Sequence, residues 1–235
     1  MNVNCCVGID LGSTTTKAVI LDEEGAVLGR GITNSRSNYT VACSVALAEG
    51  LINARFGLID GALRREGVAA PGRAARLAGL ERGFREQQYR LQLKALGRAI
   101  HSFCGDTGTT EAILDRMQAE TPGLFSEKAS RKSEFFRDLA GSRYTHHAEE
   151  IARSRGLAFD AVVGWFDRAI LDVENRRPEE GEFAACVEAA VSSGSGGPAD
   201  ADDRAALERC VRRAAGVDLK PARTVGTGYG RATLP

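Results

Sequence analysis

Residues 8–17 read Gly-Ile-Asp-Leu-Gly-Ser-Thr-Thr-Thr-Lys, and this stretch decides the fold. Asp10 stands at the end of an apolar run, and Gly12 permits a sharp turn before a second apolar run begins. A turn between two strands presents backbone N–H groups and hydroxyls to an anion. A Walker loop is excluded, because its glycine-rich loop should open a helix, whereas β-branched residues 14–16 followed by residues 18–21 favour a strand.

The flanking sequence predicts a three-stranded antiparallel meander. Residues 5–9 are apolar, residues 17–21 are apolar and rich in β-formers, and residues 26–30 follow a Glu24-Gly25 turn. From Tyr39 to Arg64 the apolar residues change to helical spacing, with Asn38 as the expected N-cap: Val41, Val45, Leu47, Leu51, Ile52 and Phe56. The sheet therefore gives way to helices at this point.

Beyond this helix the pattern stays helical to about residue 216. The strongest apolar stripe is Ala161, Val162, Trp165, Phe166, Ile170 and Leu171. Residues 192–198 predict a flexible loop that leads into a helix ending near Gly216. After Gly216 the sequence predicts a strand that runs into a tight, glycine-punctuated loop at residues 226–231.

Composition narrows the class of protein. The 235 residues are 43% hydrophobic and 26% charged, enough for one globular domain or a small domain with an insertion. Lys plus Arg and Asp plus Glu both total 31, so we expect no nucleic-acid partner and no attraction to anionic lipid. No stretch approaches the roughly 18 apolar residues of a membrane span, and the N-terminus lacks a signal peptide pattern. We therefore expect a cytoplasmic protein with no membrane association.

Residues 8–25 resemble the first phosphate-binding hairpin of the actin, sugar-kinase and Hsp70 superfamily of ATPases, whose turn embraces the β- and γ-phosphates. Residues 27–42 and 225–231 extend the match, which resembles the activator ATPases of 2-hydroxyacyl-CoA dehydratases and benzoyl-CoA reductases. The long helical segment between them is similar to the larger ATPase subunits of ATP-dependent benzoyl-CoA reductases.

The resemblance implies an α/β fold: a partial ribonuclease-H-like, actin-like ATPase N-terminal lobe with a long, mostly helical insertion. Its hairpin part would cover residues 1–48, the insertion residues 49–216, and the return strand with the TGYGR loop residues 217–235. Because relatives continue with a second phosphate hairpin and an adenosine-binding region, the chain is expected to be truncated. We expect the isolated chain to bind nucleotide weakly.

The resemblance also implies ATP and magnesium as cofactors. It assigns Asp10 a catalytic role on the magnesium side of the nucleotide, through a water molecule, and Gly12 the close approach of the backbone. The phosphates would be held by Ser13, Thr14 and Thr15, and their charge would be neutralised by Lys17 if that side chain faces the nucleotide. Two alternatives stay open at this point: Asp10 could cap the turn, and Lys17 could be a solvated strand lysine.

The second group of candidate residues lies near the C-terminal end of the sequence. Gly228 would allow close backbone approach, and Arg231 would pair with a phosphate or a carboxylate. The resemblance places this loop near the crevice between the lobes. Taken alone, the five residues 227–231 are equally typical of a structural hairpin or a strand end.

The whole complex implied by the resemblance couples ATP hydrolysis to electron transfer. A second ATPase subunit and further benzoyl-CoA reductase subunits would be partners, and ferredoxin would deliver electrons through a [4Fe-4S] cluster for the dearomatisation of benzoyl-CoA. None of the six cysteines of this chain matches a cluster ligand, and they show no CxxC spacing. The alternatives are an activator of a 2-hydroxyacyl-CoA dehydratase and a non-catalytic fragment that docks partner subunits.

Two further motifs have structural interpretations. Residues 105–110 look like a phosphate loop but lack a lysine and precede an apolar stripe, so they predict a helix cap, with Thr109 and Thr110 as the capping residues. His146 and His147 with two following glutamates lack the HExxH arrangement of a zinc site. We expect them to lie on a solvated helix surface.

Overall fold

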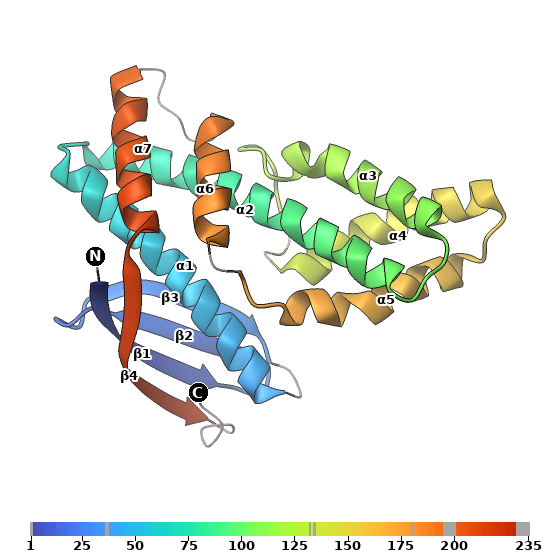
Figure 1. Ribbon diagram of the computed structural model, residues 1–235, viewed down its shortest axis with the longest axis horizontal. Coiled ribbons are helices and arrows are strands. Elements are labelled where there is room, and N and C mark those ends of the chain that lie inside the picture. The colour runs from blue at the N-terminus through green and yellow to red at the C-terminus, as the bar shows by residue number, and fades with distance from the viewer. Residues whose placement is uncertain are drawn as a thin grey trace. The chain divides into compact units, whose positions relative to one another are not determined.

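The computed structural model describes residues 2–35, 38–131, 133, 135–179, 181–194 and 201–228, with residues 201–203 described by their backbone only. The chain forms an α/β fold (Figure 1). Its elements in chain order are β1 (Asn2–Leu11), β2 (Thr15–Leu21), β3 (Val27–Asn34), α1 (Tyr39–Arg65), α2 (Ala70–His101), α3 (Thr107–Leu124), α4 (Phe136–Arg155), α5 (Phe159–Asn175), α6 (Glu182–Ser192), α7 (Ala201–Ala215) and β4 (Asp218–Gly228).

The chain divides into two compact units. The sheet unit comprises Met1–Gly83 and Arg177–Pro235, and the helical unit comprises Phe84–Arg176. Residue 49, where the sequence analysis places the start of the insertion, lies inside α1. α1 contacts β1, β2 and β3, which is why it groups with the sheet.

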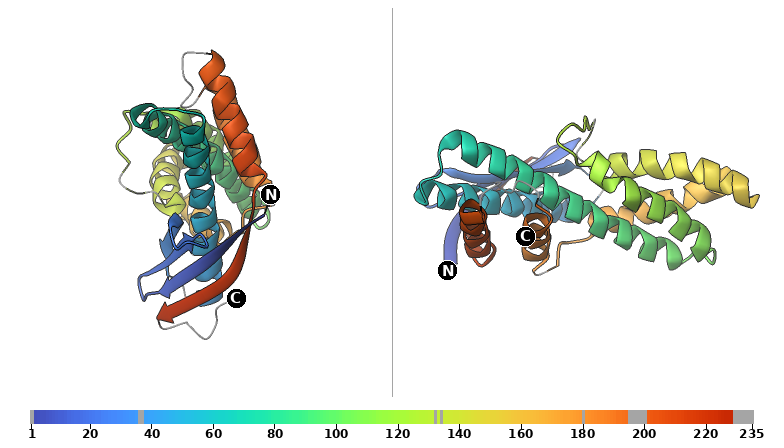
Figure 2. Two further views of the ribbon diagram at one scale, coloured as in Figure 1. Left: turned by 90° about the vertical axis from the view of Figure 1, so that its left-hand side faces the viewer. Right: turned by 90° about the horizontal axis from the view of Figure 1, so that it is seen from above.

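The four strands have the order β3-β2-β1-β4. β1 and β2 are antiparallel, as are β2 and β3, which confirms the predicted meander. β4 also confirms a predicted strand, and it pairs with β1 in parallel (Figure 2). The first and the last described elements of the chain therefore lie side by side in one sheet.

One face of the sheet forms the core of its unit. Alternate residues of β1 point toward α1 and are nearly inaccessible: Cys5, Val7, Ile9 and Leu11. On β2, Thr16, Ala18 and Ile20 are buried in the same way. The intervening residues lie on the opposite face, where the side chain of Ile32 is 48% exposed and that of Val225 is 69% exposed.

α1 packs against β3 through small residues. The fully buried residues along this helix are Ala42, Cys43, Ala46, Ala54, Ile59 and Leu63, whereas Val41, Val45, Leu47 and Leu51 are only half-buried. Of the six residues whose spacing predicted this helix, Ile52 and Phe56 are also buried. Gly29 and Gly31 let the β3 backbone approach α1 so closely that only small residues fit between them.

Hydrogen bonds fix α1 at its start and in its second half. The Asn38 side chain accepts a hydrogen bond from the backbone N–H of Val41 at 3.2 Å, which confirms the predicted N-cap. Further along the helix, Arg55 Nη1 donates to the carbonyl oxygens of Ala214 and Val217, at 3.1 and 2.6 Å. Arg55 thus ties the end of α7 and the start of β4 to the helix that covers the sheet.

α1 corrects one expectation from the sequence. Of the residues that the structure describes, it is the one helix long and apolar enough to cross a membrane, by length and composition only. The core helix of a soluble domain passes the same test. Here 39% of the apolar window is buried, including the small residues that pack against β3.

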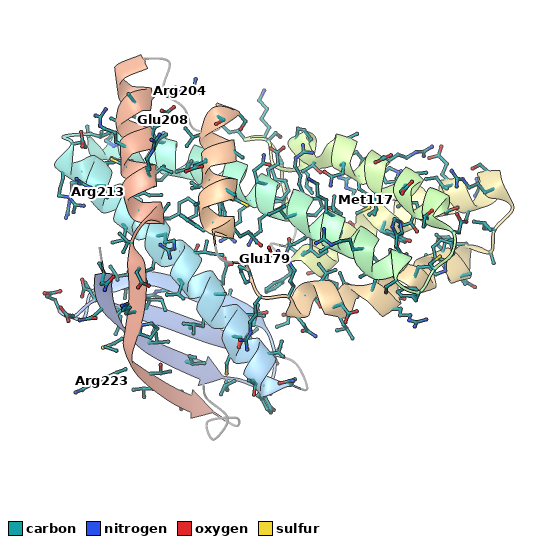
Figure 3. All side chains as sticks on the ribbon, viewed as in Figure 1. Met117, Glu179, Arg204, Glu208, Arg213 and Arg223 are labelled. Carbon is teal, nitrogen blue, oxygen red and sulfur yellow. The ribbon has the colours of Figure 1, made fainter. Side chains whose placement is uncertain are left out.

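The helical unit has a core of its own, built from the second half of α2 with α3, α4 and α5. Met117 of α3, labelled in Figure 3, is 1% exposed within it, and the hydroxyl of buried Tyr144 donates to the carbonyl oxygen of Val162 at 3.2 Å. Val162, Phe166 and Ile170 from the predicted α5 stripe are buried. Leu171 is 51% exposed, so the predicted stripe was too wide.

Candidate functional site

The turn between β1 and β2 is tight and solvent-exposed. β1 ends at Leu11 and β2 begins at Thr15, and the backbone N–H of Gly12 donates to the carbonyl oxygen of Thr15 at 3.1 Å. A β-carbon on Gly12 would lie 2.7 Å from that same oxygen, so the turn in this form requires glycine. Ser13 and Thr14 are exposed at its tip.

The strand register places Asp10 and Lys17 directly opposite each other. Residues paired across two antiparallel strands lie on the same face of the sheet, with β-carbons about 5 Å apart. Both side chains are exposed, on the face that α1 does not cover. Lys17 therefore faces the same side as Asp10, and one carboxylate and one ammonium group stand together beside the turn.

The polar groups of this corner are available for a ligand. Among the residues that the structure describes, the side chains of Asp10, Ser13, Thr14 and Lys17 form no hydrogen bond or ion pair. A turn-capping aspartate would accept a hydrogen bond from a turn N–H, and Asp10 accepts none from the described residues. The arrangement leaves a carboxylate, two hydroxyls and an ammonium group open to solvent.

The end of β4 lies beside this turn. Thr227 pairs with Asp10 and Gly228 pairs with Leu11, the residue before Gly12. Gly228 has φ +95°, and a β-carbon there would overlap the carbonyl oxygen of Leu11, so both its conformation and its close approach require glycine. Of the predicted second group, Gly228 is thus brought to the turn, while Arg231 lies outside the described residues.

Ser35, which the sequence analysis did not select, forms hydrogen bonds to the carbonyl oxygens of the turn. Its Oγ donates to the carbonyl oxygen of Gly12 at 2.6 Å and lies 3.1 Å from Oγ1 of Thr16. Its backbone N–H donates to the carbonyl oxygen of Thr14 at 2.8 Å. The predicted meander could have identified Ser35, because the end of a third strand must lie beside the start of the second.

The residues at this corner fit a magnesium–nucleotide ligand. An exposed carboxylate is the hard oxygen donor that Mg²⁺ accepts, directly or through water. The unpaired hydroxyls and the ammonium group of Lys17 suit the negative oxygens of a triphosphate. Such a ligand would supply a phosphoryl group for transfer to water, and the chain's own residues would hold it.

The cysteines of the described residues do not form a cluster site. Cys5, Cys43, Cys186 and Cys210 are buried, and Cys6 and Cys104 are half-buried. Burial raises the pKa of the thiols of Cys5, Cys43 and Cys210, whereas a metal ligand must be a thiolate. No group of three or more His, Cys, Asp or Glu side chains in the described part of the chain could hold a metal ion.

Replacing Gly12 by alanine should distort the turn. The added methyl group would press on the Thr15 carbonyl oxygen at 2.7 Å and break the hydrogen bond between the two residues. We expect MgATP binding by the chain to weaken by at least about tenfold, as for the loss of a hydrogen bond plus added strain. Isothermal titration measures the change, and unchanged affinity in Gly12→Ala would contradict this account.

The predictions for residues 105–110 and for the two adjacent histidines have different outcomes. The Asp106 side chain accepts a hydrogen bond from the backbone N–H of Thr109 at 2.9 Å, and this bonding with Thr109 lowers the pKa of Asp106. The predicted helix cap is confirmed, but Asp106 is the capping residue instead of Thr109 or Thr110. His147 is only 5% exposed and its Nε2 lies 3.1 Å from Oε1 of Glu120, so the predicted solvated position is wrong for this histidine.

Comparison with known proteins identifies the family of the chain. No curated protein and no solved structure shows a significant match to the chain. One family model matches almost its full length, from residue 7 to residue 235, and includes the β1–β2 turn and β4. The chain therefore belongs to the BadF/BadG/BcrA/BcrD ATPase family.

Proposed function

We propose that this chain is an ATP-binding and ATP-hydrolysing subunit of a benzoyl-CoA reductase. In this role it would couple hydrolysis to electron transfer from ferredoxin, through a [4Fe-4S] cluster held elsewhere in the complex. Family membership supports the ATPase activity. The main observation that supports this site is the pairing of Asp10 with Lys17 on the face that α1 does not cover, directly beside the exposed turn.

Each residue of the turn would contact a different part of MgATP, according to its charge and position. The Asp10 carboxylate would hold the hydrated magnesium ion that accompanies the phosphates. Lys17, on the same face, would offset the negative charge of the phosphate oxygens. Ser13 and Thr14 at the tip would donate hydrogen bonds from their hydroxyls and backbone N–H groups.

Coupling would follow from a difference in phosphate contacts. ATP offers one phosphoryl group more than ADP, so a turn that contacts the terminal phosphate binds the two nucleotides with different free energies. A ligand can shift a conformational equilibrium only by such a difference. The partners that would receive this shift are a second ATPase subunit and the other reductase subunits, in the cytoplasm.

The test is an assay of the assembled complex. The chain is produced together with the remaining benzoyl-CoA reductase subunits, and ATP hydrolysis and benzoyl-CoA reduction by reduced ferredoxin are measured together. We expect reduction to require ATP and this chain. ATP-dependent activation of a 2-hydroxyacyl-CoA dehydratase without benzoyl-CoA reduction would favour an activator, and partner capture without any nucleotide effect would favour an interaction module; either result would overturn the proposal.

A further inference from the structure

We propose that Ser35 is a positioning residue that turns the backbone N–H of Ser13 toward the nucleotide side of the sheet. The role rests on the ATP binding proposed above and concerns the same turn. Ser35 contacts residues on both sides of the tip: Gly12 and Thr16 through its Oγ, and Thr14 through its backbone N–H. No other residue described at this corner makes hydrogen bonds to all three.

The side chain of Ser35 lies on the covered face. Its Oγ is 3.1 Å from Oγ1 of Thr16, and Thr16 is fully buried on the face that packs against α1. The carbonyl oxygen of Gly12 accepts from this Oγ at 2.6 Å, so that carbonyl group points toward the covered face. Asp10 and Lys17 lie on the other face, because their positions alternate with those of the buried residues.

The planar peptide bond between Gly12 and Ser13 fixes the direction of the Ser13 N–H. The peptide unit is planar and trans, so the C=O of Gly12 and the N–H of Ser13 point in opposite directions. Fixing the Gly12 carbonyl on Ser35 therefore directs the Ser13 N–H to the open face, where Asp10 and Lys17 stand. Among the described residues this N–H donates no hydrogen bond, so it is available to an anion.

Ser35 is itself held in place. Its backbone N–H donates to the Thr14 carbonyl oxygen at 2.8 Å, which extends the pairing of β2 with β3 by one residue. β3 in turn packs against α1 through Gly29 and Gly31. The backbone of Ser35 therefore holds its hydroxyl in position. A side-chain change at this position leaves the backbone pairing in place.

Two variants distinguish the role of the Ser35 hydroxyl from that of the rest of the residue. Ser35→Ala removes the hydrogen bond to Gly12, so the peptide unit between Gly12 and Ser13 can rotate. We expect the dissociation constant for MgATP to rise about tenfold, the effect of one lost hydrogen bond to a bound anion, and ATP hydrolysis at low ATP to fall in proportion. Ser35→Thr keeps the hydroxyl and should restore wild-type binding.

The matched control is Ser142→Ala. Ser142 is an exposed serine of α4 whose Oγ donates to the carbonyl oxygen of Leu139 at 3.3 Å, so the change again removes one hydroxyl-to-carbonyl bond. We expect no change in nucleotide affinity. Amide hydrogen exchange without nucleotide gives a second readout: the Gly12 N–H, bonded to Thr15, should exchange about tenfold faster in Ser35→Ala alone.

The experiment titrates MgATP into the complex that contains each variant and measures exchange on the chain. A wild type that binds no MgATP would overturn the proposed function and this role with it. A wild type that binds while Ser35→Ala binds equally well would overturn the role alone. So would unchanged exchange at Gly12, or a folded Ser35→Thr variant that loses affinity as Ser35→Ala does.

Discussion

Replacing Asp10 by alanine or asparagine should lower ATP hydrolysis by about a hundredfold. Removal of a carboxylate that holds a metal through water typically costs 10- to 100-fold in metal affinity or activity. Asp10 is exposed beside the turn and pairs with Lys17 across the strands. The rate is measured as phosphate release by the assembled complex, across a range of magnesium concentrations.

The control for this prediction is Glu24→Gln. Glu24 is an exposed carboxylate in the β2–β3 turn, at the opposite end of the same meander, so the variant makes the same change of charge away from the site. We expect hydrolysis by this variant to equal that of the wild type. Undiminished turnover in Asp10→Ala would remove the proposed role of Asp10.

Replacing Gly31 by alanine should destabilise the sheet unit by about 3 kcal/mol or more, because overpacking at rigid backbone contacts costs this much. A β-carbon on Gly31 would lie 2.5 Å from the backbone nitrogen of Gly50 and would overlap the carbonyl oxygen of Ala46. Both atoms belong to the backbone of α1, so relief requires the helix to move off β3. Urea denaturation followed by circular dichroism measures the loss.

Gly61→Ala is the matched control, in the same unit and on α1 itself. The nearest atom to a β-carbon there is Nη1 of Arg65 at 3.7 Å, an ordinary contact with a flexible side chain. Alanine favours a helix interior over glycine by about 1 kcal/mol, so this variant should be as stable as the wild type or more stable. Equal stability of the Gly31→Ala and Gly61→Ala variants would show that the helix and strand are less tightly packed than described.

The hairpin could be predicted because local physics sets it. Alternating apolar residues, a glycine turn and β-branched threonines favour two antiparallel strands without help from the rest of the chain. The same pattern placed Asp10 at the end of β1. It did not decide which way Lys17 faces, because a shift of one residue in the strand register would reverse that side chain.

Long-range contacts account for what the sequence did not predict. Where α1 meets β3, its residues are small, such as Ala46, because Gly31 on another element brings a backbone within contact distance. Hydrophobic periodicity favours large residues and cannot anticipate this. The parallel pairing of β4 and the hydrogen bonds of Ser35 likewise depend on how elements assemble, which leaves no local pattern.

The pairing of β1 with β4 has a consequence during synthesis. The partner of Ile9 is Gly226, and the partner of Asp10 is Thr227, so these neighbours in the sheet are separated by most of this chain during synthesis. At roughly 5–20 residues per second the ribosome needs on the order of ten seconds or more to join them. Until then the edge of β1 that will pair with β4 stays unpaired. An unpaired strand edge can pair with another chain or bind a chaperone. The helical unit has its own core and is complete well before β4 emerges, so it can fold first.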